Sequence, residues 1–109
     1  MRILVCHEEP VVRLGIRTAL AREADCQIAG EAGDARQAAL LAESERPDVA
    51  LVHASLPPEG SGMEVMRQLA RPRASAGPLR IVAIGTAVDE DRILELIAAG
   101  ARGHPLLDV

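Results

Sequence analysis

A histidine, His53, stands where this sequence is most expected to carry chemistry. The residues before it, Val49-Ala-Leu-Val52, form a short apolar run rich in β-branched residues, and Pro57, Pro58 and Gly60 follow closely. Such a run, ended by proline and glycine, is typical of a strand buried on both faces of a sheet. Open parallel α/β sheets bind ligands beside the carboxyl ends of their strands. His53 is therefore the first candidate for a functional residue.

The composition limits what else the chain can do. Its 109 residues suit one compact domain, and 49% of them are hydrophobic although none is aromatic. With 12 basic and 16 acidic side chains the net charge is −4, which offers no basic surface for nucleic-acid phosphates or for a membrane. Because no apolar run approaches the ~20 residues of a membrane span and the N-terminus lacks a signal-peptide pattern, we expect a cytoplasmic protein.

The two cysteines are expected to remain reduced. Cys6 falls late in the first predicted strand and Cys26 falls early in the second. If these strands run parallel, the offset separates the two Cα atoms by roughly 13 Å, whereas a disulfide spans at most ~7 Å. A disulfide between them is therefore not expected.

The rest of the chain alternates predicted strands with predicted helices. Strands are predicted at residues 2–6, 26–30, 49–52, 79–84 and 103–107, with a proline-rich loop at 71–78. The first helix is predicted to start near Pro10 and its region to be closed by Asp25, and the second runs from the N-cap Asp34 to Ser44. The third follows a capping box at Ser61 and precedes the loop at 71–78, and the fourth runs from Thr86 or Asp89 to a C-terminal glycine, Gly100. This alternation predicts βαβ units and a parallel sheet.

The last predicted strand lies within a few residues of Val109, so a fifth helix has no room in this sequence. One flank of the sheet would then be under-covered. We expect that the fifth helix belongs to a longer native chain. The alternative is that a partner subunit covers this flank.

Several stretches, in order, resemble the receiver domains of bacterial response regulators, most closely those of the NarL/FixJ (LuxR-type) subfamily. The resemblance covers the whole chain. It rests on Arg2-Ile-Leu-Val5, Pro10-Val-Val-Arg13, Gly30-Glu-Ala-Gly-Asp34, Arg46-Pro-Asp-Val49, Ser55-Leu-Pro57, Gly62-Met-Glu-Val65 and Ala99-Gly-Ala-Arg-Gly103. It implies an α/β, flavodoxin-like (CheY-like) three-layer fold whose parallel five-stranded sheet has the order 2-1-3-4-5.

The resemblance also implies a phosphorylation pocket, but the residues at its positions depart from the family pattern. The phosphoryl-accepting aspartate falls on His53, and the acidic pair after the first strand falls on His7 and Glu8. The switch positions fall on Gly85, or Thr86 if the alignment shifts by one residue, on His104 in place of an aromatic residue, and on Leu107 in place of a lysine.

These departures predict a receiver-like domain (residues 1–109) that is not phosphorylated. Aspartyl phosphorylation needs a carboxylate nucleophile, a Mg²⁺ ion on oxygen ligands, and a cation and a hydroxyl that hold the product. We expect a non-enzymatic regulatory module without a cofactor, which acts through homodimerisation or contacts with another regulator protein. The family implies a C-terminal helix-turn-helix domain outside this sequence, and DNA contact is expected only through that domain.

A different function of the same pocket stays open. His7, Glu8 and His53 follow adjacent strands in the implied sheet, and two imidazoles with a carboxylate are a plausible set of ligands for Zn²⁺ or Ni²⁺. A small molecule bound near His53 and Ser55, or a pH response of the histidines, is also open. Because no fourth ligand is evident, we expect no resident metal and regard the two histidines first as polar residues that fill the pocket.

Overall fold

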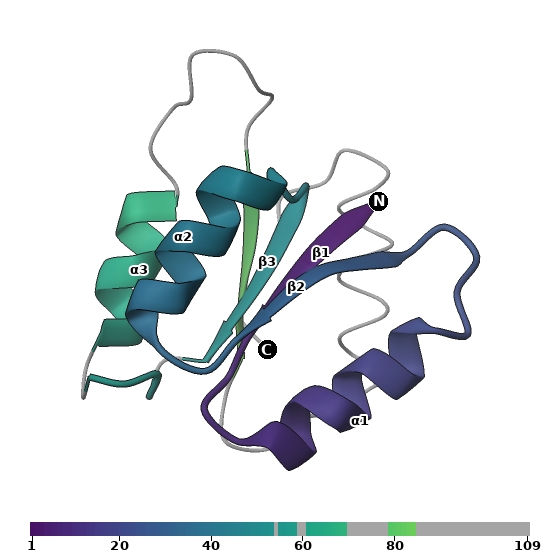
Figure 1. Ribbon diagram of the computed structural model, residues 1–109, viewed down its shortest axis with the longest axis horizontal. Helices are drawn as coiled ribbons and strands as arrows, with labels where there is room; N and C mark the ends of the chain where they lie inside the picture. The colour runs from purple at the N-terminus through teal and green to yellow at the C-terminus, as the bar shows by residue number, and fades with distance from the viewer. Residues whose placement is uncertain (54, 59–60, 70–78, 85–109) are drawn as a thin grey trace.

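The structure is a parallel β-sheet with helices on both faces (Figure 1). This computed structural model describes residues 1–53, 55–58, 61–69 and 79–84. In chain order the elements are β1 (Arg2–Cys6), α1 (Pro10–Leu20), β2 (Gln27–Ala32), α2 (Ala35–Glu45), β3 (Val49–His53), α3 (Ser61–Leu69) and β4 (Arg80–Ile84). The predicted loop at 71–78, the fourth helix and the fifth strand lie outside the described residues.

Strands β1 and β3 lie at the centre of the described sheet. The strand order is β2-β1-β3-β4, and every neighbouring pair is parallel. Cys6 lies opposite Val52, and His53 lies opposite Ile84, so the carboxyl ends of β1, β3 and β4 meet at one edge. This order confirms the prediction for these four strands.

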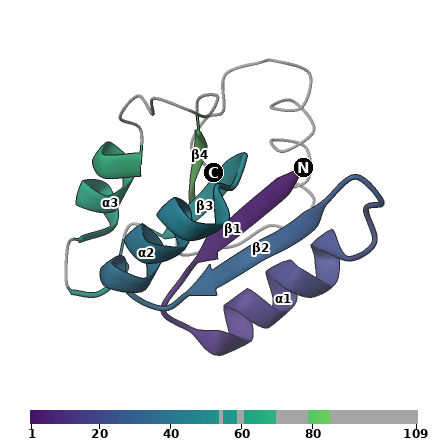
Figure 2. The same ribbon diagram turned by 45° about the horizontal axis from the view of Figure 1, so that its top comes forward.

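Different helices cover the two faces of the sheet (Figure 2). On one face α1 packs Ile16 and Leu20 against alternate residues of the strands, which are Ile3, Val5, Val49, Leu51, Val82 and Ile84. On the other face α2 and α3 cover Leu4, Cys6, Ala50 and Val52, using Ala38, Ala42, Val65 and Leu69. Because helices lie on both sides, every residue of β3 is buried, as its apolar run predicts.

Local sequence signals explain where the helices begin and end. Pro10 is the first residue of α1, where its missing N–H costs nothing. Asp34 is the N-cap of α2, and its carboxylate accepts a hydrogen bond of 2.8 Å from the Gln37 amide. The helix ends at Arg46, which is left-handed with φ 46°, and Pro47 follows it.

Strand β2 is displaced from its predicted position. It covers Gln27–Ala32 rather than 26–30, because its last residues pair with β1 after a register shift between Ile3 and Leu4. The His7 amide extends this pairing with a 2.9 Å hydrogen bond to the Ala32 carbonyl. Cys26 therefore precedes the strand, and both cysteines are free, as predicted.

Helix α1 also presents apolar side chains to solvent. Val11 is 77% exposed and Leu14 is 49% exposed, one turn apart on the same helix. Within the described residues, no helix has the length and apolar character that crossing a membrane requires.

Candidate functional site

The two histidines at the predicted pocket positions meet at the carboxyl ends of β1 and β3. His7 directly follows β1 and His53 ends β3; both are buried, and their rings stack with centroids 4.2 Å apart and an interplanar angle of 17°. Oε1 of Glu8 lies 2.7 Å from Nδ1 of His53 and 3.3 Å from Nδ1 of His7. We call these three residues the His7–Glu8–His53 cluster.

The hydrogen bonds assign a tautomer to each ring. The backbone amide of Glu9 donates to Nδ1 of His7 over 3.0 Å, so this nitrogen carries no proton and the neutral ring is protonated at Nε2. An ionised Glu8 can only accept, so Nδ1 of His53 donates the 2.7 Å hydrogen bond. The two neighbouring rings therefore carry their protons on different nitrogens.

Burial and neighbouring charges set the protonation states in the cluster. The pKa of His7 is lowered, and burial is the largest cause. The charges of His53 and Arg13 also lower this pKa, whereas those of Glu8 and Glu9 raise it. Burial alone would raise the pKa of Glu8, but hydrogen bonds from its own amide and from His53, together with the histidine charges, lower it. At neutral pH the cluster therefore holds a neutral His7 beside an ionised Glu8.

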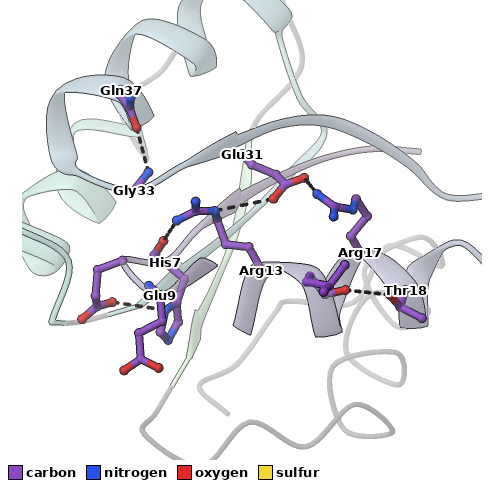
Figure 3. Close-up of polar contacts among 10 residues, drawn as sticks. His7, Glu9, Arg13, Arg17, Thr18, Glu31, Gly33 and Gln37 are labelled. Carbon is purple, nitrogen blue, oxygen red and sulfur yellow. Dashed lines mark hydrogen bonds and ion pairs between the residues drawn. The ribbon is translucent and has the colours of Figure 1, made fainter. Parts of the chain in front are cut away.

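A second polar group supports this edge of the sheet (Figure 3). Arg13 of α1 donates a 2.6 Å hydrogen bond to the carbonyl oxygen of His7, and its Nε lies 3.5 Å from Oε1 of Glu31 in β2. Glu31 also accepts a hydrogen bond from Arg17, one turn further along α1. We call this group the Arg13–Glu31–Arg17 network; it fastens the loop after β1 to α1 and β2.

Reasoning from the sequence did not assign this role to Arg13. A signal was present, because Arg13 and Arg17 share one helical stripe with the buried residues Ile16 and Leu20. A cation on an apolar stripe indicates a partner on the element beneath it. The partner, Glu31, was not identifiable because the predicted second strand ended before it.

The other predicted pocket positions fall in two groups. Ser55 is exposed and follows β3 by two residues, and Leu56 after it is fully buried. The switch positions Gly85, Thr86, His104 and Leu107 lie outside the described residues. The predicted pocket positions that the structure describes therefore lie in the loop after β1 and at and just after the end of β3.

The donor atoms of the cluster are close enough to act on one ligand. His7, Glu8 and His53 each offer one possible ligand atom, and these three atoms lie within 4.8 Å of one another. Two imidazoles and a carboxylate can ligate a transition metal or exchange protons near neutral pH. They provide one carboxylate, whereas Mg²⁺ prefers several hard oxygen ligands.

The described structure is a parallel α/β sheet with polar side chains at its carboxyl edge, and the comparisons with known proteins show which family has this fold. The model of the response regulator receiver domain family matches residues 3–104. The chain therefore belongs to the response regulator receiver domain family, which confirms the resemblance found in the sequence.

The similar curated proteins are transcriptional regulators. The chain is 34% identical over 109 residues to the uncharacterized transcriptional regulatory protein YxjL of Bacillus subtilis, covering 99% of the chain and 48% of that protein. It is 29% identical over 107 residues to the nitrate/nitrite response regulator protein NarL of Escherichia coli K12, covering 98% of this chain and 48% of that protein. The chain spans about half the length of these curated relatives.

Solved structures support the fold. A LuxR-family two-component response regulator from Aurantimonas sp. SI85-9A1 aligns with a TM-score of 0.81 at 23% identity, covering 96% of this chain and 87% of that one. The isolated receiver domain of RcsB from Salmonella enterica, solved with the phosphomimetic BeF3-, aligns with a TM-score of 0.79 at 15% identity, covering 98% and 92%. At these identities the likeness concerns the fold.

Proposed function

We propose that this chain is a phosphorylation-independent receiver domain of a transcriptional response regulator. The observation that carries the proposal is His53, which stands at the end of β3 where the family places the phosphoryl-accepting aspartate. Its Nδ1 donates to the Glu8 carboxylate at 2.7 Å, and an imidazole replaces the carboxylate nucleophile that aspartyl phosphorylation requires.

The electrostatics of the pocket support the proposal. An incoming phosphoryl group is anionic, and the nearest described carboxylate, Glu8, is ionised at neutral pH because its pKa is lowered. The nearest cation in the network, Arg13, is turned toward the His7 carbonyl and Glu31. Phosphoryl transfer depends on metal ions and cations that neutralise the transferred group.

In this proposal the output is a protein contact rather than catalysis. The exposed apolar side chains Val11 and Leu14 on α1 offer a surface for a second copy of the chain or for another regulator protein. By analogy with the family, DNA is bound through a separate helix-turn-helix domain, and the protein works in the cytoplasm. Residues 1–109 then form the regulatory domain and have no enzymatic role.

The experiment is incubation of the purified protein with acetyl phosphate and Mg²⁺, followed by intact mass measurement. We expect no added phosphoryl group, while a receiver domain that carries the aspartate gains one under the same conditions. An acid-labile adduct that survives alkali would identify phosphohistidine and overturn the proposal. An adduct removed by hydroxylamine would identify an acyl phosphate and overturn it equally.

A second candidate function is ligand sensing by the pocket. It is favoured by the convergence of His7, Glu8 and His53, whose ligand atoms lie within 4.8 Å of one another, and by the exposed Ser55 two residues after His53. A small molecule or a metal ion would then replace phosphorylation as the input. A ligand that binds one conformation more tightly than another shifts the population toward it, as phosphorylation does in the family.

A further inference from the structure

We propose that His7, Glu8 and His53 bind one divalent transition-metal ion of the Zn²⁺ class. This site specifies the ligand-sensing candidate above and rests on it. It does not depend on whether the domain dimerises. Within the described residues, no other group of three or more His, Cys, Asp or Glu side chains is arranged to hold an ion.

Two of the three donor distances are close to those of a tetrahedral ion, and all three donor atoms lie within 4.8 Å of one another. With bonds of about 2.0–2.1 Å, neighbouring ligands of a tetrahedral Zn²⁺ lie about 3.3 Å apart. Oε1 of Glu8 lies 3.3 Å from Nδ1 of His7, which already matches, and 2.7 Å from Nδ1 of His53, which must open by about half an ångström. A water molecule would complete the coordination at the open side.

Two existing contacts must change when the ion binds. The metal would take the place of the proton on Nδ1 of His53 that is now donated to Glu8, and that proton would move to Nε2 of the same ring. The metal would also take the lone pair of His7 that now accepts from the Glu9 amide. Because a metal lies close to the plane of the ring that ligates it, one of the rings, stacked at 17°, must also rotate. These changes couple metal binding to the conformation of the loop after β1.

The chemistry of the donors selects the metal. Two imidazole nitrogens and one carboxylate suit Zn²⁺, Co²⁺, Ni²⁺ or Cu²⁺, whereas Mg²⁺ requires more oxygen ligands. His7 and His53 are buried, while the side chain of Glu8 is 26% exposed and gives the ion a path from solvent.

The test uses the purified, chelator-treated protein with ZnCl₂, CoCl₂ or MgCl₂ alone. We expect a rise in Tm that saturates at one Zn²⁺ per chain, intense visible absorption of tetrahedral Co²⁺, and no response to Mg²⁺. A weak octahedral Co²⁺ spectrum would overturn the site.

Matched variants locate the ion. Glu8→Gln and His53→Ala should each weaken Zn²⁺ binding at least tenfold. Losing even a residue that only supports a metal ligand typically weakens metal binding by about 10–100-fold. Glu9→Gln, an adjacent carboxylate outside the cluster, should bind like the original protein. If His53→Ala does not fold, Glu8→Gln decides, because its side chain is partly exposed and nearly isosteric.

Unchanged Zn²⁺ affinity in the folded Glu8→Gln variant would place the ion elsewhere and overturn the proposal. Failure here is distinguishable from failure of phosphorylation independence. The mass measurement with acetyl phosphate and Mg²⁺ contains no transition metal, so each result can fail without the other.

Discussion

Two polar groups flank the end of β1, and they differ in whether their charges can change. The Arg13–Glu31–Arg17 network joins guanidinium groups, which stay ionised throughout the stable pH range, to one carboxylate. The His7–Glu8–His53 cluster joins two imidazoles to a carboxylate, and imidazole titrates close to physiological pH. The first group therefore contains permanent cations, whereas the second contains rings of a type that can gain or lose a proton.

The difference explains why these groups lie where they do. Arg13 donates to the backbone carbonyl of His7 and not to its ring. It therefore holds the backbone of the loop and leaves the imidazole able to bind a proton or a ligand. The network is suited to support, and the cluster is suited to receive a proton or a ligand. The comparison predicts that variants of the network change stability, whereas variants of the cluster change the response to pH and metal.

The largest expected effect comes from Arg13→Ala. It removes the 2.6 Å hydrogen bond to the His7 carbonyl and the contact with Glu31, and hydrogen bonds of charged groups contribute about 1.5–3 kcal/mol. We expect a loss of that size in the free energy of unfolding, measured with urea. Arg17→Ala is the matched control: its side chain is 48% exposed, so its loss should stay below about 1 kcal/mol. Equal losses would contradict a special role for Arg13.

The next effect is a dependence of stability on pH that involves His7. Its pKa is lowered in the folded protein, so the unfolded chain binds the proton more readily. The resulting stability is complete above about pH 6.5, the ordinary pKa of the ring, and is lost as the pH falls toward the folded value. The slope for one proton is at most about 1.4 kcal/mol per pH unit.

Urea unfolding between pH 7 and pH 5 checks this contribution. The original protein should lose stability more steeply than His7→Gln, whose amide oxygen can still accept from Glu9. The matched control is His104→Gln, which removes the remaining histidine of the sequence. Identical slopes for His7→Gln and the original protein would show that His7 does not respond.

The smallest effects are expected from two glycines, one that faces Arg13 and one in α1 that faces open space. A Cβ at Gly33 would lie 3.2 Å from a terminal nitrogen of Arg13, so Gly33→Ala must displace the guanidinium, at an expected cost below about 1 kcal/mol. A Cβ at Gly15, within α1, meets nothing within 4 Å, so Gly15→Ala should stabilise by about 0.5–1 kcal/mol. Thermal unfolding measures both, and effects of the same sign would contradict the packing around Arg13.

Most of the described fold could be predicted from the sequence because its signals are local. The apolar run before His53, Pro10 at the start of α1 and the cap at Asp34 each report on a few neighbouring residues. The end of β2 was predicted wrongly, because Glu31 and Ala32 join the strand only through pairing with β1. That pairing depends on residues far away in the chain.

For the site, the sequence by itself determined which chemical groups are present: imidazoles at His7 and His53, and a carboxylate at Glu8. It also placed them at strand ends, because hydrophobic runs and the residues that end them are local. Only the tertiary structure decided that both Nδ1 atoms approach the same oxygen of Glu8, and that Arg13 fastens the loop carrying His7. Hydrogen-bond partners and protonation states depend on distances of a few tenths of an ångström between separate elements, and no residue pattern encodes those distances locally.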